Sequence, residues 1–110
     1  LKNPLQPTAT VLKRGQFVYN TYCFVCHGPN GEGDGSVVAK GFPRPPSLQS
    51  DKIRHYPDGS IYHIISMGQN NMPSYASQIA PADRWSIVNY IHALQRSKHP
   101  SAEDIKAAEE

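Results

Sequence analysis

The chain has 110 residues and a formal net charge of +2, which is enough for one domain that buries only roughly 60–65% of its unfolded surface. It contains no run near the ~18 consecutive apolar residues of a membrane span, and its basic residues are scattered, which disfavours nucleic-acid binding. Ten prolines exceed the average of ~5% and, with eight glycines, predict long loops.

The N-terminal part of the chain predicts a lead-in followed by a helix. Residues 1–9 contain two prolines and are expected to be extended. From about 10 to 22 the pattern turns helical, because Gly15, Tyr19 and Cys23 recur at intervals of four and therefore share one face. This helix delivers the first cysteine of the chain.

The middle of the chain alternates between loops and one short helix. Residues 28–57 hold a glycine-rich and a proline-rich stretch and predict a long loop without regular structure, of the kind that is usually functional. Asp58 is expected to cap a short helix that runs through Ile65 and stops at Gly68. A second loop is expected over 69–80.

The C-terminal part predicts one strong helix. Pro81 suits a first-turn position, Asp83 suits the positive end of the helix dipole, and the helix is expected to run to about Ser97. Ser101 and Asp104 have the spacing of a cap for a short, polar tail helix. The apolar stripe of the main helix comprises Ile87, Ile91 and Leu94.

The predicted class is all-α, with three main helices and long loops, because no strand-length alternation of apolar and polar residues is present. We expect the extended lead-in at 1–9, one domain at 10–98 and an acidic tail at 99–110. The last ten residues carry four carboxylates against one lysine, so the rest of the chain is basic. A moderately basic body suits an acidic protein partner.

The segment Cys23-Phe24-Val25-Cys26-His27 matches C-x-x-C-H, the attachment sequence of c-type haem. Two thiols one helical turn apart can each form a thioether with the vinyl groups of one porphyrin, while the next imidazole reaches the iron. A disulfide between these cysteines would close almost no loop and contribute little stability.

Two other uses of the cysteine pair are weaker. A thioredoxin-like redox pair needs a βαβ setting, and the strands are absent from the pattern. A zinc site needs two more ligands at suitable spacing, and the chain has no second cysteine pair. The remaining histidines are scattered and are expected to be surface or capping groups: His55, His63, His92 and His99.

A haem bound at this motif takes His27 as one axial ligand and leaves the sixth position to another residue. Met72 lies in the second predicted loop before Pro73, which restricts the local backbone and holds the thioether on a semi-rigid arm. Met67 ends the short helix and suits core packing instead. We therefore expect Met72 as the sixth ligand, with Met67 or a histidine as the alternatives.

The chain from about 15 to 94 resembles the class I monohaem cytochromes c. The residues that carry the resemblance are Gly15-x-x-x-Tyr19-x-x-x-Cys23-x-x-Cys26-His27, Met72-Pro73-x-Tyr75 and Trp85-x-x-Val88-x-Tyr90-Ile91-x-x-Leu94. The resemblance implies a cytochrome c-like fold around one covalent haem c. It also implies a close crossing of the first and last helices, with Gly15 and Tyr90 in contact.

The same resemblance implies further haem contacts. A carbonyl from a proline-containing turn is expected to accept the second N–H of His27, which fixes the tautomer and raises ligand basicity. The prolines that could set this turn are Pro43, Pro45 and Pro46. The candidates for contact with the haem propionates are Arg44, Arg54, Tyr62 and Trp85, each arginine being alternatively a solvated surface charge.

More narrowly, the segments 31–35, 42–48 and 68–75 are similar to the monohaem cytochrome subunit of alternative complex III, a bacterial membrane quinol-oxidising complex. This resemblance implies a non-enzymatic subunit that relays electrons between redox protein partners, in the periplasm or at the periplasmic face of the membrane. Because the chain begins with Leu1, we expect a processed or trimmed product from which any leader or anchor would already be missing.

Two alternatives to a fixed relay remain open at this point. The first is a free-standing soluble electron shuttle. The second is a haem enzyme or gas-binding domain, which would follow if Met72 were not the sixth ligand. A non-haem interaction domain would require that Cys23 and Cys26 carry no haem.

Overall fold

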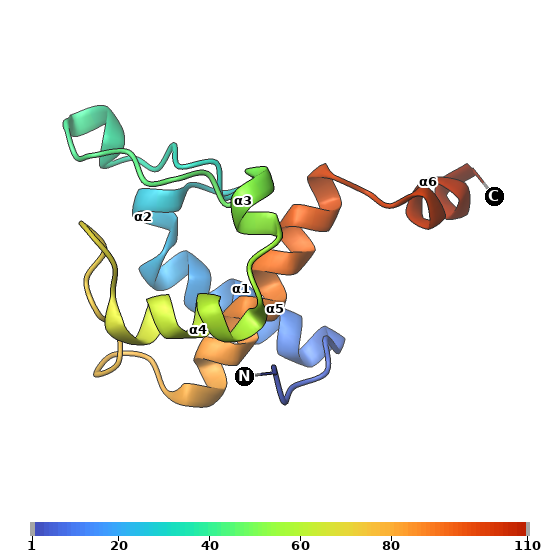
Figure 1. Ribbon diagram of the computed structural model, residues 1–110, viewed down its shortest axis with the longest axis horizontal. Coiled ribbons are helices and arrows are strands. Elements are labelled where there is room, and N and C mark those ends of the chain that lie inside the picture. Colours follow the sequence, from blue (N-terminus) through green and yellow to red (C-terminus); the bar gives the residue numbers. More distant parts are fainter. Residues whose placement is uncertain (1, 110) are drawn as a thin grey trace.

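The computed structural model describes residues 2–109, and Figure 1 shows helices joined by long irregular segments. No strand is present among the described residues, apart from one isolated bridge between Gln69 and Met72. The elements are α1 (Ala9–Tyr22), α2 (Phe24–His27), the 3-10 turn η1 (Val38–Lys40), α3 (Asp51–Arg54), α4 (Asp58–Met67), α5 (Pro81–Lys98) and α6 (Ala102–Glu109). The predicted all-α class is therefore confirmed.

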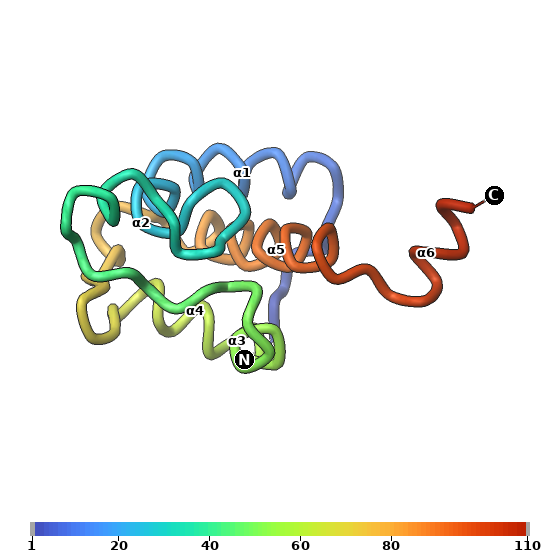
Figure 2. The backbone as a smooth tube through the Cα atoms, turned by 90° about the horizontal axis from the view of Figure 1, so that it is seen from above, coloured from blue at the N-terminus to red at the C-terminus, as the bar shows by residue number. Residues whose placement is uncertain are grey.

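The centre of the fold is the crossing of α1 and α5, which run side by side in Figure 2. A Cβ atom added at Gly15 would lie 2.2 Å from the carbonyl oxygen of Ser86 and 2.9 Å from the Cβ of Tyr90. The Tyr90 ring also packs on Tyr19, with ring centroids 5.2 Å apart. The expected contact of Gly15 with Tyr90 is confirmed, and only a glycine allows the two backbones to come this close.

Polar contacts fix the N-terminal parts of both helices. The Thr8 hydroxyl caps α1 by accepting from the backbone N–H of Val11 at 3.2 Å, so the helix starts one residue before the predicted Thr10. Arg14 donates two hydrogen bonds, of 2.9 and 3.0 Å, to the carboxylate of Asp83. The extended lead-in is tied to α5 through Asn3, which donates to the carbonyl of Trp85.

The core lies where α4 packs against the α1 and α5 pair. The ring of Tyr62 on α4 stacks on Trp85 of α5, with centroids 4.1 Å apart and planes 21° apart. The buried apolar residues around this contact are Val18, Tyr19, Cys23, Ile61, Ile65, Ile79, Ile87, Val88 and Ile91. This core covers one side of α5 and leaves a cavity between α1, α2 and α4.

The structure differs from the sequence prediction at two places in the middle of the chain. Residues 28–57 contain η1 and α3, which are single turns too short to produce a detectable period. Asp58 occupies the first turn of α4 and is not its cap, because Pro57 holds the N-cap position without a side-chain hydrogen bond. The Asp58 carboxylate instead contacts His92 of α5.

The tail helix α6 stands apart from the body in Figure 1. Its first turn has the reciprocal cap predicted from the sequence: Ser101 Oγ accepts from the Asp104 N–H at 3.1 Å, and Asp104 accepts from the Ser101 N–H at 3.0 Å. Arg96 of α5 pairs with the same carboxylate, and the pKa of Asp104 lies well below its usual range because of this pair. Leu1 and Glu110, the ends of the predicted lead-in and tail, lie outside the described residues.

None of the helices within residues 2–109 has the length and apolar character needed to cross a lipid bilayer.

Replacing Gly15 by Ala should destabilise the protein by about 3 kcal/mol, because the added methyl group would overlap the Ser86 carbonyl and force the helices apart. Thermal or denaturant unfolding of the purified protein measures this loss. Gln16→Ala, at the exposed neighbouring position of the same helix, should change stability by less than about 0.5 kcal/mol. Equal stability of the Gly15→Ala variant and the wild type would contradict the close crossing.

Candidate functional site

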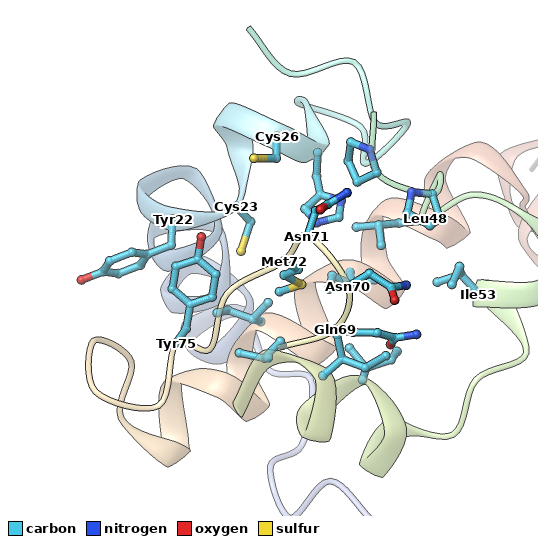
Figure 3. A pocket seen from close by; sticks show the side chains of 18 of the residues that line it. Tyr22, Cys23, Cys26, Leu48, Ile53, Gln69, Asn70, Asn71, Met72 and Tyr75 are labelled. Atoms are coloured by element: carbon cyan, nitrogen blue, oxygen red, sulfur yellow. The ribbon is translucent and has the colours of Figure 1, made fainter. Parts of the chain in front are cut away.

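A cavity of about 430 Å³ lies against the helix pair, within the size range of small-molecule and cofactor sites. Its walls come from the end of α1, from α2, from α4 and α5, from the segment around 42–56 and from the segment 69–75. Figure 3 shows the side chains that project into it. Most of these side chains are apolar or aromatic, so the cavity suits a large apolar group.

The two cysteines, three positions apart on one helical turn, both reach the cavity. Cys23 ends α1, and its carbonyl accepts the backbone N–H groups of Cys26 at 3.2 Å and His27 at 2.9 Å. This turn places both sulfur atoms on the cavity side, as Figure 3 shows. The Cys23 and Cys26 thiols are free in this structure, not joined in a disulfide.

The electrostatic setting of Cys23 disfavours redox or nucleophilic chemistry by this thiol. Burial, with a smaller contribution from Cys26 nearby, raises the pKa of Cys23 to about 12. Reactive cysteines have the opposite property, a lowered pKa that yields the thiolate at neutral pH. A thioredoxin-like redox pair also needs a βαβ setting, and the described residues contain no strand. The pair is therefore suited to structural attachment.

His27 ends α2 and contributes its ring to the same cavity. Burial lowers the pKa of His27, which keeps the imidazole neutral at pH 7, and the neutral ring is the form that ligates metals. Its Nδ1 atom is buried and has no hydrogen-bond partner among the described residues. The expected hydrogen bond from His27 to a carbonyl of a proline-containing turn is therefore not formed. Pro43, Pro45 and Pro46 nevertheless line the same cavity as His27.

The glycine-rich loop after His27 folds directly onto the backbone of the cysteine motif. The Gly33 N–H donates to the His27 carbonyl at 2.9 Å, and the Gly35 N–H donates to the Cys26 carbonyl at 3.1 Å. A Cβ atom at Gly35 would lie 2.0 Å from the carbonyl oxygen of Val25. The loop therefore requires glycine at this position, and it holds the turn that carries the thiols and the imidazole.

Met72 lies on a short arm that follows α4. Gly68 ends the helix with φ 79°, and Gln69 and Met72 exchange two backbone hydrogen bonds, of 3.0 and 2.9 Å. Asn70 takes the left-handed conformation at the tip, with φ 53°, a conformation that Asn and Gly tolerate best. This tight turn returns the chain so that the Met72 side chain enters the cavity, as Figure 3 shows.

Met67, the alternative ligand, points away. Its side chain is 66% exposed and does not line the cavity. The other four histidines do not line it either, so within residues 2–109 Met72 is the one further methionine or histidine that reaches the cavity beside His27.

The four residues predicted to contact the haem propionates do not all line the cavity. Arg44 lines the cavity, whereas Arg54, Tyr62 and Trp85 do not. Arg54 uses its guanidinium locally, donating to the carbonyl of Gln49 at 3.0 Å and pairing with Asp51. Tyr62 and Trp85 are occupied with each other in the stack between α4 and α5. The sequence carries no information on which way these side chains turn.

Sequence reasoning missed most of the apolar wall. Leu48 and Ile53 project from the segment after the prolines, and Ile64 projects from α4. The apolar periodicity of α4 could have indicated Ile64, whereas the single turn of α3 is too short to indicate Ile53. The other cavity residues that no motif indicated are Tyr22, Ser50, Lys52 and Tyr56.

The donor set fits a covalently attached haem and does not fit zinc. Two free thiols, one neutral imidazole with a buried ring nitrogen and one thioether face a single large apolar cavity. Zinc sites are built from at least three or four Cys, His, Asp or Glu side chains, and residues 2–109 bring together no group of three such side chains.

Comparison with known proteins agrees with this geometry. Residues 10–91 match the protein family described as cytochrome C oxidase, cbb3-type, subunit III. The chain belongs to this family of cytochrome c domains. The expected cytochrome c-like fold and covalent c-type haem are thereby confirmed, and the coarse function is haem-based electron transfer.

Two relatives place this cytochrome c domain among larger redox proteins. It is 30% identical, over 83% of its length, to the dehydrogenase subunit of alcohol dehydrogenase (quinone) from Acetobacter aceti. It is also similar to a chain of the reducing HAO-like protein complex of Kuenenia stuttgartiensis, with 29% identity over 83% of its length and a TM-score of 0.71. The domain spans 12% of the first protein and 46% of the second chain.

Denaturing extraction should leave one haem on the polypeptide, because thioether bonds at Cys23 and Cys26 survive unfolding. Intact-mass spectrometry of the chain purified from its native host should show the added mass of one haem and no thiol that iodoacetamide can alkylate. A Cys26→Ala variant should retain at most one thioether. Detection of the bare polypeptide mass with two alkylatable cysteines would contradict the assignment.

Proposed function

We propose that this cytochrome c domain relays single electrons between protein partners through a haem with His27 and Met72 as axial ligands. The observation that carries the proposal is the entry of both side chains into one apolar cavity from separate segments. Bound haem supplies a one-electron carrier. With both axial ligands provided by the chain, no position is left for a substrate, which supports electron transfer over the enzyme or gas-binding alternative.

The cavity walls serve this role by excluding water. Ile61, Ile65, Ile87 and Ile91 form a wall from α4 and α5, and these four side chains are at most 7% exposed. A dry, apolar setting disfavours the additional positive charge of the ferric state, and thioether ligation acts in the same direction. These residues therefore support a raised reduction potential.

The charged residues at the cavity are positive. Arg44 and Lys52 line it, and no carboxylate is among the described residues that do so. Phe42, which is 44% exposed, adds an apolar contact beside them. This combination supports docking of an acidic redox protein near the haem, as the basic body of the chain implies.

We further infer that the domain is a non-enzymatic subunit of a bacterial quinol-oxidising complex related to alternative complex III, at the periplasmic face of the membrane. The segments 31–35, 42–48 and 68–75 carry this inference through their resemblance to that complex's monohaem subunit. The two relatives named above are a quinone-dependent alcohol dehydrogenase subunit and a chain of a reducing HAO-like protein complex. Both support redox subunits as the partners, with a free-standing shuttle as the alternative.

Replacing Met72 by Ala should open the iron to carbon monoxide and lower the reduction potential by on the order of 0.2 V, within the roughly 0.8 V that axial ligands span. Absorption spectra with carbon monoxide and a redox titration of the purified holoprotein measure both effects. Met67→Leu is the matched control, and because Met67 is exposed it should shift stability by less than about 0.5 kcal/mol and leave the spectrum unchanged.

Two results would overturn the ligand assignment. The first is a Met72→Ala variant with the wild-type spectrum and potential. The second is a wild-type protein that binds carbon monoxide as readily as the variant, which would favour the enzyme or gas-binding alternative.

Electron exchange with an acidic redox protein should slow as salt is raised, because screening acts over ~10 Å near 0.1 M. Stopped-flow rates over a range of ionic strength measure this. Lys52→Gln should lower the low-salt rate by about twofold, whereas Lys13→Gln, at an exposed position of α1 outside the cavity lining, should have a smaller effect. A rate independent of salt would indicate a permanently assembled relay with an apolar interface.

A further inference from the structure

Arg84, a half-buried residue in the first turn of α5, donates hydrogen bonds from all three guanidinium nitrogens. Its Nε donates to the carbonyl of Ile79 at 2.8 Å, and one Nη donates to the carbonyl of Ala76 at 2.9 Å. The other Nη donates to the hydroxyls of Ser66 at 3.1 Å and Tyr62 at 3.4 Å. The guanidinium also lies over the Tyr62 ring, 5.6 Å from its centroid. Each nitrogen of the fork is therefore engaged.

These contacts join three segments that are separate in the sequence. Arg84 belongs to α5, its hydroxyl partners belong to α4, and its carbonyl partners belong to the segment 76–79 that follows the Met72 arm. No carboxylate is among the partners of Arg84 within the described residues. The other paired arginines, Arg14, Arg54 and Arg96, each contact an aspartate. Arg84 thus binds backbone rather than a counter-ion.

Ser66 extends the link toward Met72. Its hydroxyl, which accepts from Arg84, donates to the carbonyl of Tyr62, and its own carbonyl accepts from the Ser74 hydroxyl at 2.5 Å. The Tyr75 N–H donates to the Ile65 carbonyl at 3.0 Å. These hydrogen bonds attach residues 74 and 75 to the end of α4. The backbone hydrogen bonds between Gln69 and Met72 fix the chain on the other side of Met72.

We propose that Arg84 is a positioning residue, which clamps the segment after Met72 onto α4 and α5 and thereby keeps Met72 at the sixth position of the haem iron. This inference rests on the proposed His27 and Met72 ligation. A thioether is a weak ligand that exchanges when its segment moves, and the guanidinium hydrogen bonds hold that segment at two carbonyls. A lysine at this position would keep the charge and lose the planar fork.

The rate at which cyanide binds the ferric holoprotein tests the clamp, because cyanide can enter only when Met72 leaves. Arg84→Gln should raise this rate at least about tenfold, since hydrogen bonds from a charged group to the arm are lost. Arg84→Lys should also raise the rate, because it cannot hold both carbonyls. Both resting variants should keep the low-spin spectrum. If Arg84→Gln does not assemble with haem, Arg84→Lys alone provides the test.

Arg14→Gln is the matched control. Arg14 belongs to α1 and pairs with Asp83, the neighbour of Arg84 on the first turn of α5, so its contact lies between α1 and α5 and not at the Met72 arm. It should change the cyanide rate by less than about twofold. Cyanide rates of the Arg84 variants within twofold of the wild type, or an equal increase in Arg14→Gln, would overturn the clamp.

The failure of the underlying function has a different signature. If the wild-type protein bound cyanide as fast as Met72→Ala, the ligation itself would be wrong and the clamp would fall with it. If the wild type resisted cyanide and the Arg84 variants did so equally, only the role of Arg84 would be wrong.

Discussion

The constraint on which this structure depends is the single helical turn from Cys23 to His27. The hydrogen bond from the His27 N–H to the Cys23 carbonyl, at 2.9 Å, fixes the turn and commits two thiols and one imidazole to the same side. All remaining walls must then be supplied by residues distant in the sequence. The isoleucines of α4 and α5, the proline-containing segment and the Met72 arm meet this requirement around one cavity.

Long loops surround that cavity, and their backbone polar groups are satisfied by contacts that also fix their position. Gln49 donates from one amide to the carbonyls of Asn30 and Leu94, at 2.8 and 3.0 Å. Gln95 of α5 donates to the carbonyl of Leu48 at 2.9 Å. Two buried glutamines thus connect the glycine-rich loop, the segment after the prolines and α5. The loops are irregular but their geometry is specified.

The parts of the molecule that could be predicted are those with a local signal. The C-x-x-C-H motif, the 3.6-residue periodicity of α1 and α5, and the Pro81 start of α5 each depend on neighbours in the sequence. The close contact of Gly15 with α5 was predicted only through a family resemblance. Tyr62, Trp85 and Arg54 were predicted as haem contacts but do not line the cavity, because the direction of a side chain depends on which tertiary partner it meets. Arg84 was missed for the same reason, since its partners are backbone carbonyls that no motif encodes.

The crossing of α1 and α5 has a consequence for how the chain folds. Gly15 and Ser86 are about seventy positions apart, so their contact closes about two thirds of the chain, and closure entropy grows with the logarithm of that length. A single helix can form in microseconds. The contact of Gly15 with Ser86 forms only after two distant parts of the chain meet, and such contacts raise the contact order and slow folding. A chain whose two ends meet late exposes Cys23 and Cys26 for longer. That interval is when the cysteines are accessible for attachment, before the cavity walls close over them.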